Sequence, residues 1–481
     1  MRKHLLTTTA AMLLAMTGVA FADMEAAKKF LDAEVGDMSA LDRATQEAEM
    51  QWFIDAAKPF SGMEIKVVSE TITTHEYESK VLAPAFTAIT GIKITHDLIG
   101  EGDVVEKLQT QMQSGENIYD AYVNDSDLIG THWRYKQARS LTDWMASEGK
   151  DVTNPGLDLQ DFIGLKFTTA PDGKLYQLPD QQFANLYWFR YDWFNDEKNK
   201  ADFKAKYGYD LGVPVNWSAY EDIAEFFTGR EIDGKTVYGA SIYTERGSEG
   251  ITMGVMDVLY SYGFKYDNPE KPYEMEGFVN SEGAVKGLEF YKSLYDCCVA
   301  PGTSNTYMGE GIDAYKSGQV AMQMNFAFTW PGFEADPNVG GGKTGYLVNP
   351  AGPGGEKFAQ LGGQGISVVA NTDNMDGALA YIKWFAQKDV QDKWWSMGGF
   401  SCLSAVVEDP NFAKSQPYAQ TFLDSMAIVK DFWAEPSYAS LLQASQKRFH
   451  DYVVAGNGTA KEALDGLIAD WTETFEDEGK L

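Results

Sequence analysis

Short motifs that could do chemistry occur in this sequence, but each one lacks a required residue. Gly342-Lys-Thr344 matches the end of a phosphate-binding loop, GxxxxGK(S/T), whose first glycine would fall at Pro337. His75 and Glu76 lack the second histidine, four residues after the first, of a zinc-protease helix. Ser367 lies in GISVV rather than in the GxSxG of a nucleophile elbow. The sequence therefore predicts none of these three activities.

Metal-binding signals are also incomplete. Asn124-Asp-Ser-Asp127 resembles a calcium loop in composition, but it lacks the glycine and the closing glutamate. No pair of cysteines has CxxC spacing, and the histidines that follow residue 22 are too scattered to predict a cluster. We expect neither a metal nor another cofactor. These histidines are His75, His96, His132 and His450.

Strands that alternate with helices position the polar residues of the first part of the chain. Helices are predicted over Tyr77–Thr90, closed by Gly91, and over a stripe from Val104 to Met112 that ends at Ser114-Gly115. This alternation predicts an α/β fold with a mostly parallel sheet and helices on both faces. The predicted strands are Met63–Val68, Ile92–His96 and Tyr119–Val123.

Two polar loops follow predicted strands, namely Ser69–His75 and Asn124–Asp127. In open α/β sheets ligands bind beyond the carboxyl ends of the strands, so these loops are the first candidates for a binding site. Helix capping is an alternative role, by Thr73 or Thr74 in the first loop and by Asp125 or Ser126 in the second. The sequence leaves both roles open.

Further helices and strands are predicted in the rest of the chain. A helical segment over 25–60 precedes the first strand, and a Gly/Pro-rich segment over 340–365 suits a crossing between domains or loops near a cleft. Ser218 is the predicted cap of a helix over 219–227, with Glu221 in the capping box. Further strands are predicted over 185–191, 237–243, 318–325 and 365–370, helices over 284–295 and 376–387, and a mainly helical tail over 416–475.

Composition indicates a soluble, multidomain globular protein. The 481 residues are 44% hydrophobic, 13% aromatic and 23% charged, which suits two to four domains with large cores. Lysine and arginine total 40 against 70 acidic residues, and a net charge of −30 repels nucleic acid and anionic lipid. We expect no nucleic-acid partner and interpret the charge as a solvated acidic exterior.

The N-terminus predicts export. Residues 1–22 combine a basic start, a short apolar run and Ala20-Phe-Ala22 ahead of Asp23, as in a cleaved secretory signal peptide. We expect a soluble periplasmic product without a lipid anchor, because the first cysteine is Cys297. Cys402 could pair with Cys297 or Cys298, or all three could remain thiols.

Five segments in a fixed order resemble the extracellular solute-binding proteins of ABC importers, the maltose-binding-like family of carbohydrate and polyol binders. The resemblance covers roughly residues 62–410, and Thr73–Lys80 and Leu178–Phe194 look most like members associated with glycerol and other polyols. Residues 25–60 depart from the common sugar binders. The five segments are Gly173–Pro179 with Leu186–Phe194, Val213–Ile223, Gly318–Met322 with Trp330-Pro331, Gly362–Val369, and Ala378–Phe385.

This resemblance implies a two-lobed periplasmic-binding-protein fold of class α/β, with a hinge and discontinuous domains. A helical extension over 23–61 would follow the signal peptide. Residues 62–181 with 348–400 would form lobe I, and residues 182–347 with 401–481 would form lobe II. It also implies a monomer that closes on a carbohydrate or polyol and delivers it to the transmembrane subunits of an ABC permease.

Hydroxyl groups need both donors and acceptors, and aromatic rings cover the C–H faces of sugars and polyols. The expected ligand contacts are therefore polar residues at strand ends, at the first crossing between lobes and among glycines, with aromatic residues beside them. For Tyr243 and Trp330 core packing is the alternative role. The predicted site residues are Glu70, His75, Asn124, Asp125, Gln181, Gln182, Tyr243, Asn325, Trp330 and Gln364.

Three functions stay open at this point. The first is a periplasmic binding protein for a sugar or polyol. The second is a secreted carbohydrate-active enzyme, because among 70 acidic residues two will lie the required ~5–9 Å apart in any fold. The third is a protein of the same family that binds an amine, amino acid or sulfonate, since aromatic rings and acids also suit a cation. We expect no catalytic residue, because no other feature supports the enzyme.

Overall fold

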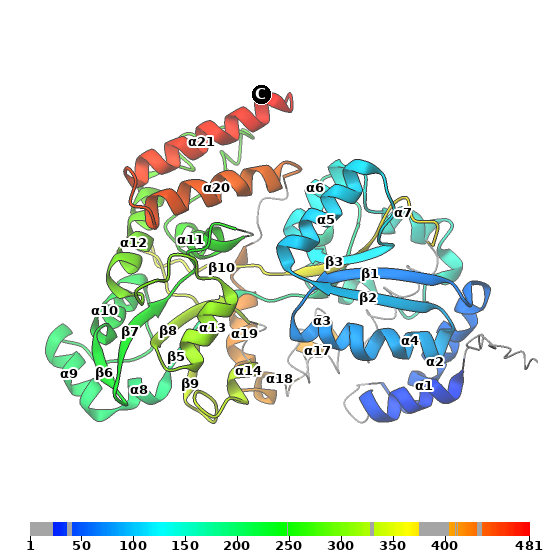
Figure 1. Cartoon of the computed structure of the whole chain (residues 1–481), viewed down its shortest axis with the longest axis horizontal. Coiled ribbons are helices and arrows are strands. Elements are labelled where there is room, and N and C mark those ends of the chain that lie inside the picture. Colours follow the sequence, from blue (N-terminus) through cyan, green and yellow to red (C-terminus); the bar gives the residue numbers. More distant parts are fainter. Residues whose placement is uncertain are drawn as a thin grey trace, which may run out of the picture.

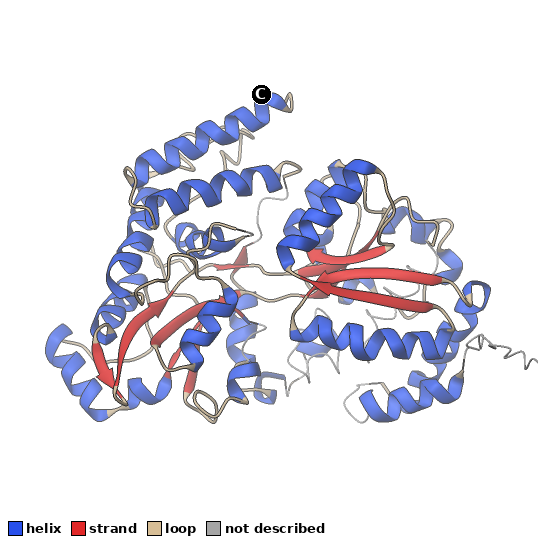
Figure 2. Ribbon diagram, viewed as in Figure 1, coloured by secondary structure: helices blue, strands red, loops and turns tan. Residues whose placement is uncertain are grey.

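The computed structural model describes residues 23–35, 41–247, 249–327, 331–374, 404–408, 410, 412–430 and 435–481. These residues form two lobes side by side, each built on a five-stranded sheet with helices packed on it (Figures 1 and 2). The α/β class and the two-lobed arrangement predicted from the sequence are confirmed. The signal peptide, the helix predicted over 376–387, Trp330 and Cys402 lie outside the described residues.

The first sheet has the strand order β2-β1-β3-β11-β4. β1 pairs in parallel with β2 and β3, whereas β11 runs antiparallel to both β3 and β4. The predicted parallel arrangement of the first three strands is confirmed, and β11 alone runs opposite to the other four because it brings the chain back from the other lobe. The strands are β1 (Glu64–Glu70), β2 (Lys93–Ile99), β3 (Ala121–Asp125), β4 (Leu178–Gln181) and β11 (Gln364–Val368).

Helices cover both faces of the first sheet, with α5 on one face and α3 and α4 on the other (Figure 1). α3 (Thr73–Tyr77), a π-helical turn (Glu78–Leu82) and α4 (Ala83–Thr90) form one helical run. It ends at Gly91, whose φ of 77° is left-handed, as predicted. The run begins four residues before the predicted start, so His75 lies in a helix rather than in a loop.

The predicted N-terminal helical segment is also confirmed, and it packs against α4. α5 ends before Gly115, as the stripe predicts. The remaining helices of this half are α1 (Met24–Phe30), a π-helical turn (Leu31–Val35), α2 (Arg43–Ala57), α5 (Glu101–Ser114), α6 (Ile129–Arg134) and α7 (Leu141–Ala146). Short 3-10 turns lie at Lys58–Phe60, Ser126–Leu128, Lys150–Val152, Leu159–Asp161 and Leu165–Thr168.

The second sheet has the order β6-β7-β8-β5-β9, in which only β7 and β8 pair in parallel. The aromatic strand β5 lies inside this sheet and all of its residues are buried, as its composition predicts. The bounds are β5 (Asn185–Arg190), β6 (Arg230–Ile232), β7 (Lys235–Ser241), β8 (Val320–Phe326) and β9 (Thr344–Leu347). Tyr243 therefore follows β7 by two residues.

Helix α11 is buried over its whole length and packs against α12 and α20. The predicted helical tail is confirmed in α19, α20 and α21, of which α20 and α21 lie together above the second lobe in the view of Figure 1. The helices are α8 (Tyr191–Asn195), α9 (Glu197–Tyr207), α10 (Trp217–Phe227), α11 (Gly250–Ser261), α12 (Glu282–Cys298), α13 (Met308–Lys316), α14 (Pro331–Glu334), α17 (Ser404–Val407), α18 (Phe412–Ser415), α19 (Ala419–Met426), α20 (Tyr438–Val453) and α21 (Ala460–Asp477).

Two local predictions need correction. The cap of α10 is Asn216, not Ser218, and the Asn216 side chain accepts a hydrogen bond from Ala219 N at 2.9 Å. The helix begins earlier than predicted because the side chain of Trp217 is buried in the core, which makes Trp217 the first helical residue. Among the cysteines, the disulfide joins Cys297 to Cys298 rather than either of them to Cys402.

The chain crosses between the sheets over residues 182–184, between β4 and β5, and returns between β9 and β11. The return includes β10 (Ala359–Gln360), which pairs with β12 (Val429–Lys430). Gln360 N donates a hydrogen bond to the buried carboxyl of Asp257 at 2.9 Å, which fixes this segment to α11. In the described part of the chain, no helix has the length and apolar character needed to cross a bilayer.

We expect Gly239→Ala to destabilise the second lobe. A Cβ added to Gly239, in β7, would come within 1.9 Å of the backbone oxygen of Ala224 in α10, so strand and helix would have to separate. Overpacking of this kind costs about 1–3 kcal/mol or more in the free energy of unfolding. Gly212→Ala, where the added Cβ meets nothing within 4 Å, is the control. Urea unfolding of both variants checks this, and equal midpoints would contradict it.

We expect Asp257→Asn to reduce the change of the free energy of unfolding with pH. Burial raises the pKa of the Asp257 carboxyl well above its ordinary value, so it keeps a proton that the unfolded chain has already lost. The wild type then loses stability as pH rises above the unfolded pKa, by at most ~1.4 kcal/mol per pH unit. Asparagine keeps the acceptor for Gln360 N and does not ionise.

The measurement is the free energy of unfolding in urea at about pH 5 and pH 8 for wild type and Asp257→Asn. The variant should lose less stability than the wild type between the two values. Asp424→Asn, at an exposed carboxylate, should behave like the wild type. An unchanged slope in Asp257→Asn would show that the buried carboxyl does not titrate as expected.

Candidate functional site

A cavity of about 320 Å³ lies between the first lobe and the helices α11 and α20. One side of it comes from the N-terminal turns of α5 and the end of β3. The other side comes from the start of α11 and one face of α20. The lining residues are Glu101, Gly102, Val105, Glu106, Gln109, Asp125, Leu128, Glu249, Ala439, Leu442, Gln443 and Gln446.

Three carboxylates meet in this cavity, from Glu101, Asp125 and Glu249, with one oxygen of each within 4.8 Å of the others. Glu101 begins α5 just after β2, Asp125 ends β3, and Glu249 precedes α11. Two like charges at this separation repel by about 3–4 kcal/mol at an effective dielectric constant of 20. Hydroxyl donors or a cation placed among these oxygens would relieve that repulsion.

Two tyrosines lie close to these carboxylates. The rings of Tyr243 and Tyr307 are 4.8 Å apart between centroids, and Tyr243 Oη donates to Asn325 Oδ1 at 2.6 Å. Tyr307 Oη is buried and makes no hydrogen bond within the described part of the chain. Burial raises the pKa of Tyr307, and the carboxylates of Glu101 and Glu249 raise it further. Its hydroxyl therefore stays protonated as a donor near the acids.

The amide of Gln364 connects the cavity to the strands behind it. Gln364 Nε2 donates to Glu70 Oε1 at 2.5 Å and to Asp125 Oδ1 at 3.1 Å, and Gln364 Oε1 accepts from Gln181 Nε2 at 2.6 Å. The strand register explains this, because Gln364 lies opposite Asp125 in β3 and opposite Gln181 in β4. Glu70, Gln181 and Gln364 are buried, so the network fixes the orientation of Asp125 at the cavity.

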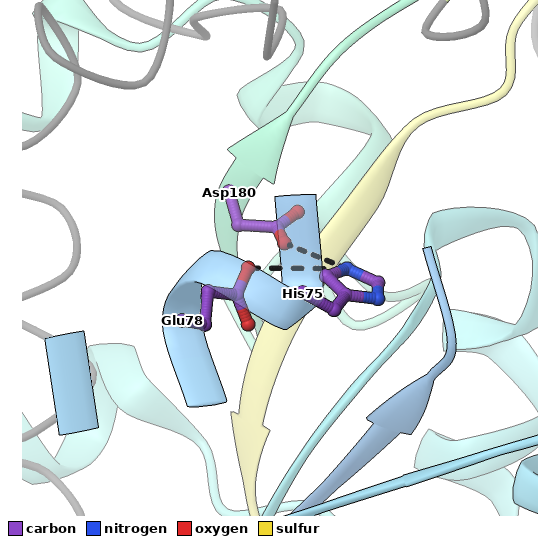
Figure 3. Close-up of side chains that lie close together, drawn as sticks. All are labelled: His75, Glu78 and Asp180. Atoms are coloured by element: carbon purple, nitrogen blue, oxygen red, sulfur yellow. Dashed lines mark ion pairs between the residues drawn. The ribbon is translucent and has the colours of Figure 1, made fainter. Parts of the chain in front are cut away.

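A second group of titratable side chains, His75, Glu78 and Asp180, lies close together in the first lobe (Figure 3), and all three are buried. The His75 ring, in α3, has Nδ1 at 3.0 Å from the Glu70 backbone oxygen. Its Nε2 lies 3.9 Å from Glu78 Oε1 and 3.8 Å from Asp180 Oδ2. Burial alone would lower the pKa of His75, but the carboxylates of Glu78, Asp180 and Glu70 raise it to about 10.

His96 joins the same group from β2. Its Nε2 forms a 2.7 Å hydrogen bond with Ser69 Oγ and lies 3.8 Å from Glu78 Oε2. Burial lowers the pKa of His96 to about 3, so this ring is neutral, and burial raises the pKa of Glu78 to about 8. The expectation that the histidines are too scattered to cluster is therefore wrong for His75 and His96, because β1 and β2 are neighbours and α3 directly follows β1.

Comparison with known proteins assigns the chain to a family. The family model described as bacterial extracellular solute-binding protein matches residues 72–392, well over half of the chain. The chain belongs to this family. The match contains Asp125 and Glu249, which line the cavity, and Gln364, which donates a hydrogen bond to Asp125.

Two curated relatives and one solved structure are similar to this solute-binding protein. A probable ABC transporter-binding protein of Deinococcus radiodurans is 23% identical over 52% of this chain and 57% of its own length. An erythritol/L-threitol-binding protein of Mycolicibacterium smegmatis is 24% identical over 69% of this chain and 68% of its own. The chain thus spans little more than half the length of the first relative.

The solved structure is that of an ABC transporter solute-binding protein from Agrobacterium radiobacter in complex with ribitol. It has a TM-score of 0.71 and 20% identity, and the superposition covers 86% of this chain and 99% of that one. At this level of identity the similarity establishes a shared fold. It agrees with the two five-stranded sheets described above.

The solute-binding protein brings some of its predicted site residues together and separates others. Glu70, Asp125, Gln181 and Gln364 share one hydrogen-bond network, while Tyr243 and Asn325 bond to each other. Among the predicted residues that the structure describes, Asp125 alone lines the cavity. Helix capping, the alternative role, does not use Asp125, whose side chain makes no cap bond, and α3 has Ile72 as its cap.

The other predicted residues lie apart from the cavity lining. His75 belongs to the buried charged group. Asn124 is buried next to Asp125 on the opposite face of β3, and its Oδ1 has no hydrogen-bond partner in the described structure. Gln182 is buried against Gly363, where an added Cβ would come within 2.4 Å of Gln182 Oε1. Trp330 lies outside the described residues.

Sequence reasoning misses several residues at the cavity. Glu101 follows the end of β2, so the strand-end rule that selects Glu70 and Asp125 could also have selected it. Glu249 lies after an irregular segment, and Gln446 lies in the C-terminal tail far from any strand end. Tyr307 lies between α12 and α13, where the sequence has no distinctive pattern. Only tertiary packing brings Glu249 and Gln446 to the cavity and Tyr307 close to its carboxylates.

Replacing Gln364 tests the polar network. Gln364→Leu removes the amide that donates to Glu70 and Asp125, and leaves the Glu70 carboxylate buried without that donor. We expect a loss of about 1–3 kcal/mol or more in the free energy of unfolding. Gln420→Leu removes an exposed amide that donates to Asp424 and should cost less than about 0.5 kcal/mol. Urea unfolding compares the two, and similar losses would contradict a structural role for Gln364.

Proposed function

We propose that this chain is the periplasmic substrate-binding component of an ABC importer, and that it binds a small polyol or sugar between its lobes. The observation that carries the proposal is the convergence of Glu101 and Asp125 from the first lobe and Glu249 from the second on one cavity. A ligand that satisfies all three must touch both lobes. Binding is then coupled to closure about the crossings between the sheets.

The chemistry of the cavity suits a molecule with several hydroxyl groups. Each carboxylate accepts hydroxyl protons in charge-assisted hydrogen bonds, and Gln443 and Gln446 add amide donors and acceptors. The apolar side chains of Val105, Leu128 and Leu442 offer contact to C–H groups. A deoxy analogue would leave a buried acceptor without its donor, at a cost of about 1–3 kcal/mol, which provides selectivity.

The size of the cavity supports a small ligand over an oligosaccharide. Its volume of about 320 Å³ is at the lower end of the range of about 300–1,000 Å³ for ligand pockets. The relatives point the same way, since one is an erythritol/L-threitol-binding protein and the solved structure holds ribitol. We infer a linear polyol of a few carbons, glycerol-like compounds included, as the ligand class.

The remaining parts of the proposal concern the whole protein. Secreted through the signal peptide of residues 1–22, it would act as a monomer in the periplasm and release its ligand unchanged to the permease. We keep residues 62–181 with 348–400 and residues 182–347 with 401–481 as the proposed lobes. We propose Asp125 in the cavity, Tyr243 close to its carboxylates and the residues that orient them as the ligand-binding group, with Trp330 retained from the sequence prediction.

A cationic ligand is the second candidate. Three carboxylates within 4.8 Å of one another, with the rings of Tyr243 and Tyr307 nearby, form an arrangement that also attracts an ammonium group. Loss of one negative charge weakens the binding of an organic cation more than that of a polyol. Hydroxyl donors still bond to an amide oxygen, whereas a cation loses a full charge partner.

A ligand panel with Asp125→Asn separates the candidates. We expect erythritol, ribitol or glycerol to raise the unfolding temperature of the wild type, because a ligand at about 100 times its Kd adds roughly 2.7 kcal/mol. Asp125→Asn should weaken that ligand about 10- to 100-fold, and Asp313→Asn, at an exposed carboxylate, should leave its Kd unchanged. Calorimetric titration gives both values. A shift with betaines or amines alone would reject the polyol.

A further inference from the structure

Three side chains converge on one point inside the first lobe, away from the cavity. His75 Nε2, Glu78 Oε1 and Asp180 Oδ2 all lie within 4.8 Å of one another, and Figure 3 shows both carboxylates directed at the ring. Their side chains are at most 2% exposed. His75 and Glu78 come from one helical run, three residues apart, and Asp180 comes from β4, so two segments far apart in the sequence meet here.

The hydrogen bond on the other side of the imidazole fixes which nitrogen faces the carboxylates. Nδ1 lies 3.0 Å from the backbone oxygen of Glu70, which can only accept, so Nδ1 carries a hydrogen and donates it. Nε2 is therefore the nitrogen that faces Glu78 and Asp180, and it becomes a ligand when a metal ion displaces its proton. A histidine that ligates a metal ion almost always has its second nitrogen bonded in this way.

The distances leave room for an atom between the three groups. Nε2 lies 3.9 Å and 3.8 Å from the two carboxylate oxygens, beyond the ~3.2 Å limit of a direct hydrogen bond. His75 Nε2 and Glu78 Oε1 are buried and form no hydrogen bond in the described structure. Two tetrahedral ligands of one ion at bond lengths of about 2.0–2.2 Å are separated by roughly 3.3–3.6 Å, so the side chains would have to move a few tenths of an ångström closer.

The negative charge of the carboxylates around His75 also favours the binding of a cation. The carboxyl groups of Glu70, Glu78 and Asp180 are all buried. Within the described residues, Glu78 lies within 4 Å of the rings of His75 and His96 and forms no ion pair with a lysine or arginine. Burying several carboxylates around one imidazole is costly unless they are protonated or coordinate a positive ion.

We propose that His75, Glu78 and Asp180 bind one divalent transition-metal ion, with Zn²⁺ the best match to one imidazole and two carboxylates. Zn²⁺ accepts nitrogen and oxygen ligands in tetrahedral sites, and a fourth position remains for water or the second oxygen of a carboxylate. The ion would join α3 to β4 just before the first crossing between the lobes. It lies outside the cavity and does not depend on the identity of the transported ligand.

Zinc titration of the full mature chain tests the proposal. After chelation and removal of the chelator, calorimetry with ZnCl₂ should give one site per chain, and His75→Gln should weaken it at least tenfold. His132→Gln is the matched control, because His132 is equally buried but bonds to Tyr122 Oη at 3.0 Å instead of facing carboxylates. Absence of binding to the wild type, or equal affinity in His75→Gln, would overturn the proposal.

A second measurement keeps the test decisive if His75→Gln does not fold. X-ray absorption of the wild-type chain loaded with one equivalent of Zn²⁺ should show nitrogen and oxygen neighbours at about 2.0–2.1 Å, including imidazole scattering. A sulfur neighbour at about 2.3 Å would assign the ion to cysteine and reject the site. Oxygen scattering without imidazole would place the ion on surface carboxylates and would equally reject it.

Discussion

One amide group holds two carboxylates of the first lobe in place. Gln364 donates both of its Nε2 hydrogens, one to Glu70 and one to Asp125, while its oxygen accepts from Gln181. Three of the four side chains are buried, so every hydrogen bond among them has to be made within the protein. The Asp125 carboxylate can present acceptors to the cavity because this network fixes its position. The fold must therefore keep β3, β11 and β4 adjacent and in register.

That requirement explains the mixed sheet. β11 belongs to a segment that returns from the second lobe, and it enters the first sheet between two strands that precede it by far in the chain. The lobes are consequently tied by strands within the sheets as well as by surface contacts. Thr131 and Arg134 of α6 add contacts to Pro436 and Glu478 near the C-terminus. Opening and closing must take place about these connections.

The local sequence pattern is sufficient to predict the helices and strands and part of the candidate site. The periodicity of apolar residues locates β1, β2 and α5, and the strand-end rule selects Glu70 and Asp125 from the sequence alone. It cannot show that β11 runs antiparallel, because strand direction depends on where the chain re-enters the sheet. Nor can it place Glu249 or α20 at the cavity, since helix packing between distant segments leaves no local signal. The pairing of His75 with Asp180 is equally non-local.

Because β11 and α20 lie late in the chain, the first sheet and the cavity are completed late in synthesis. During synthesis, residues up to β4 provide most of the first sheet, yet the slot between β3 and β4 stays unfilled until residues 364–368 have been made. α20, which begins at Tyr438, supplies one side of the cavity later still. Contacts of such long sequence separation form slowly, because loop closure precedes any gain from packing. The cavity is therefore complete only after the last part of the chain has been made and α20 has packed against the first lobe.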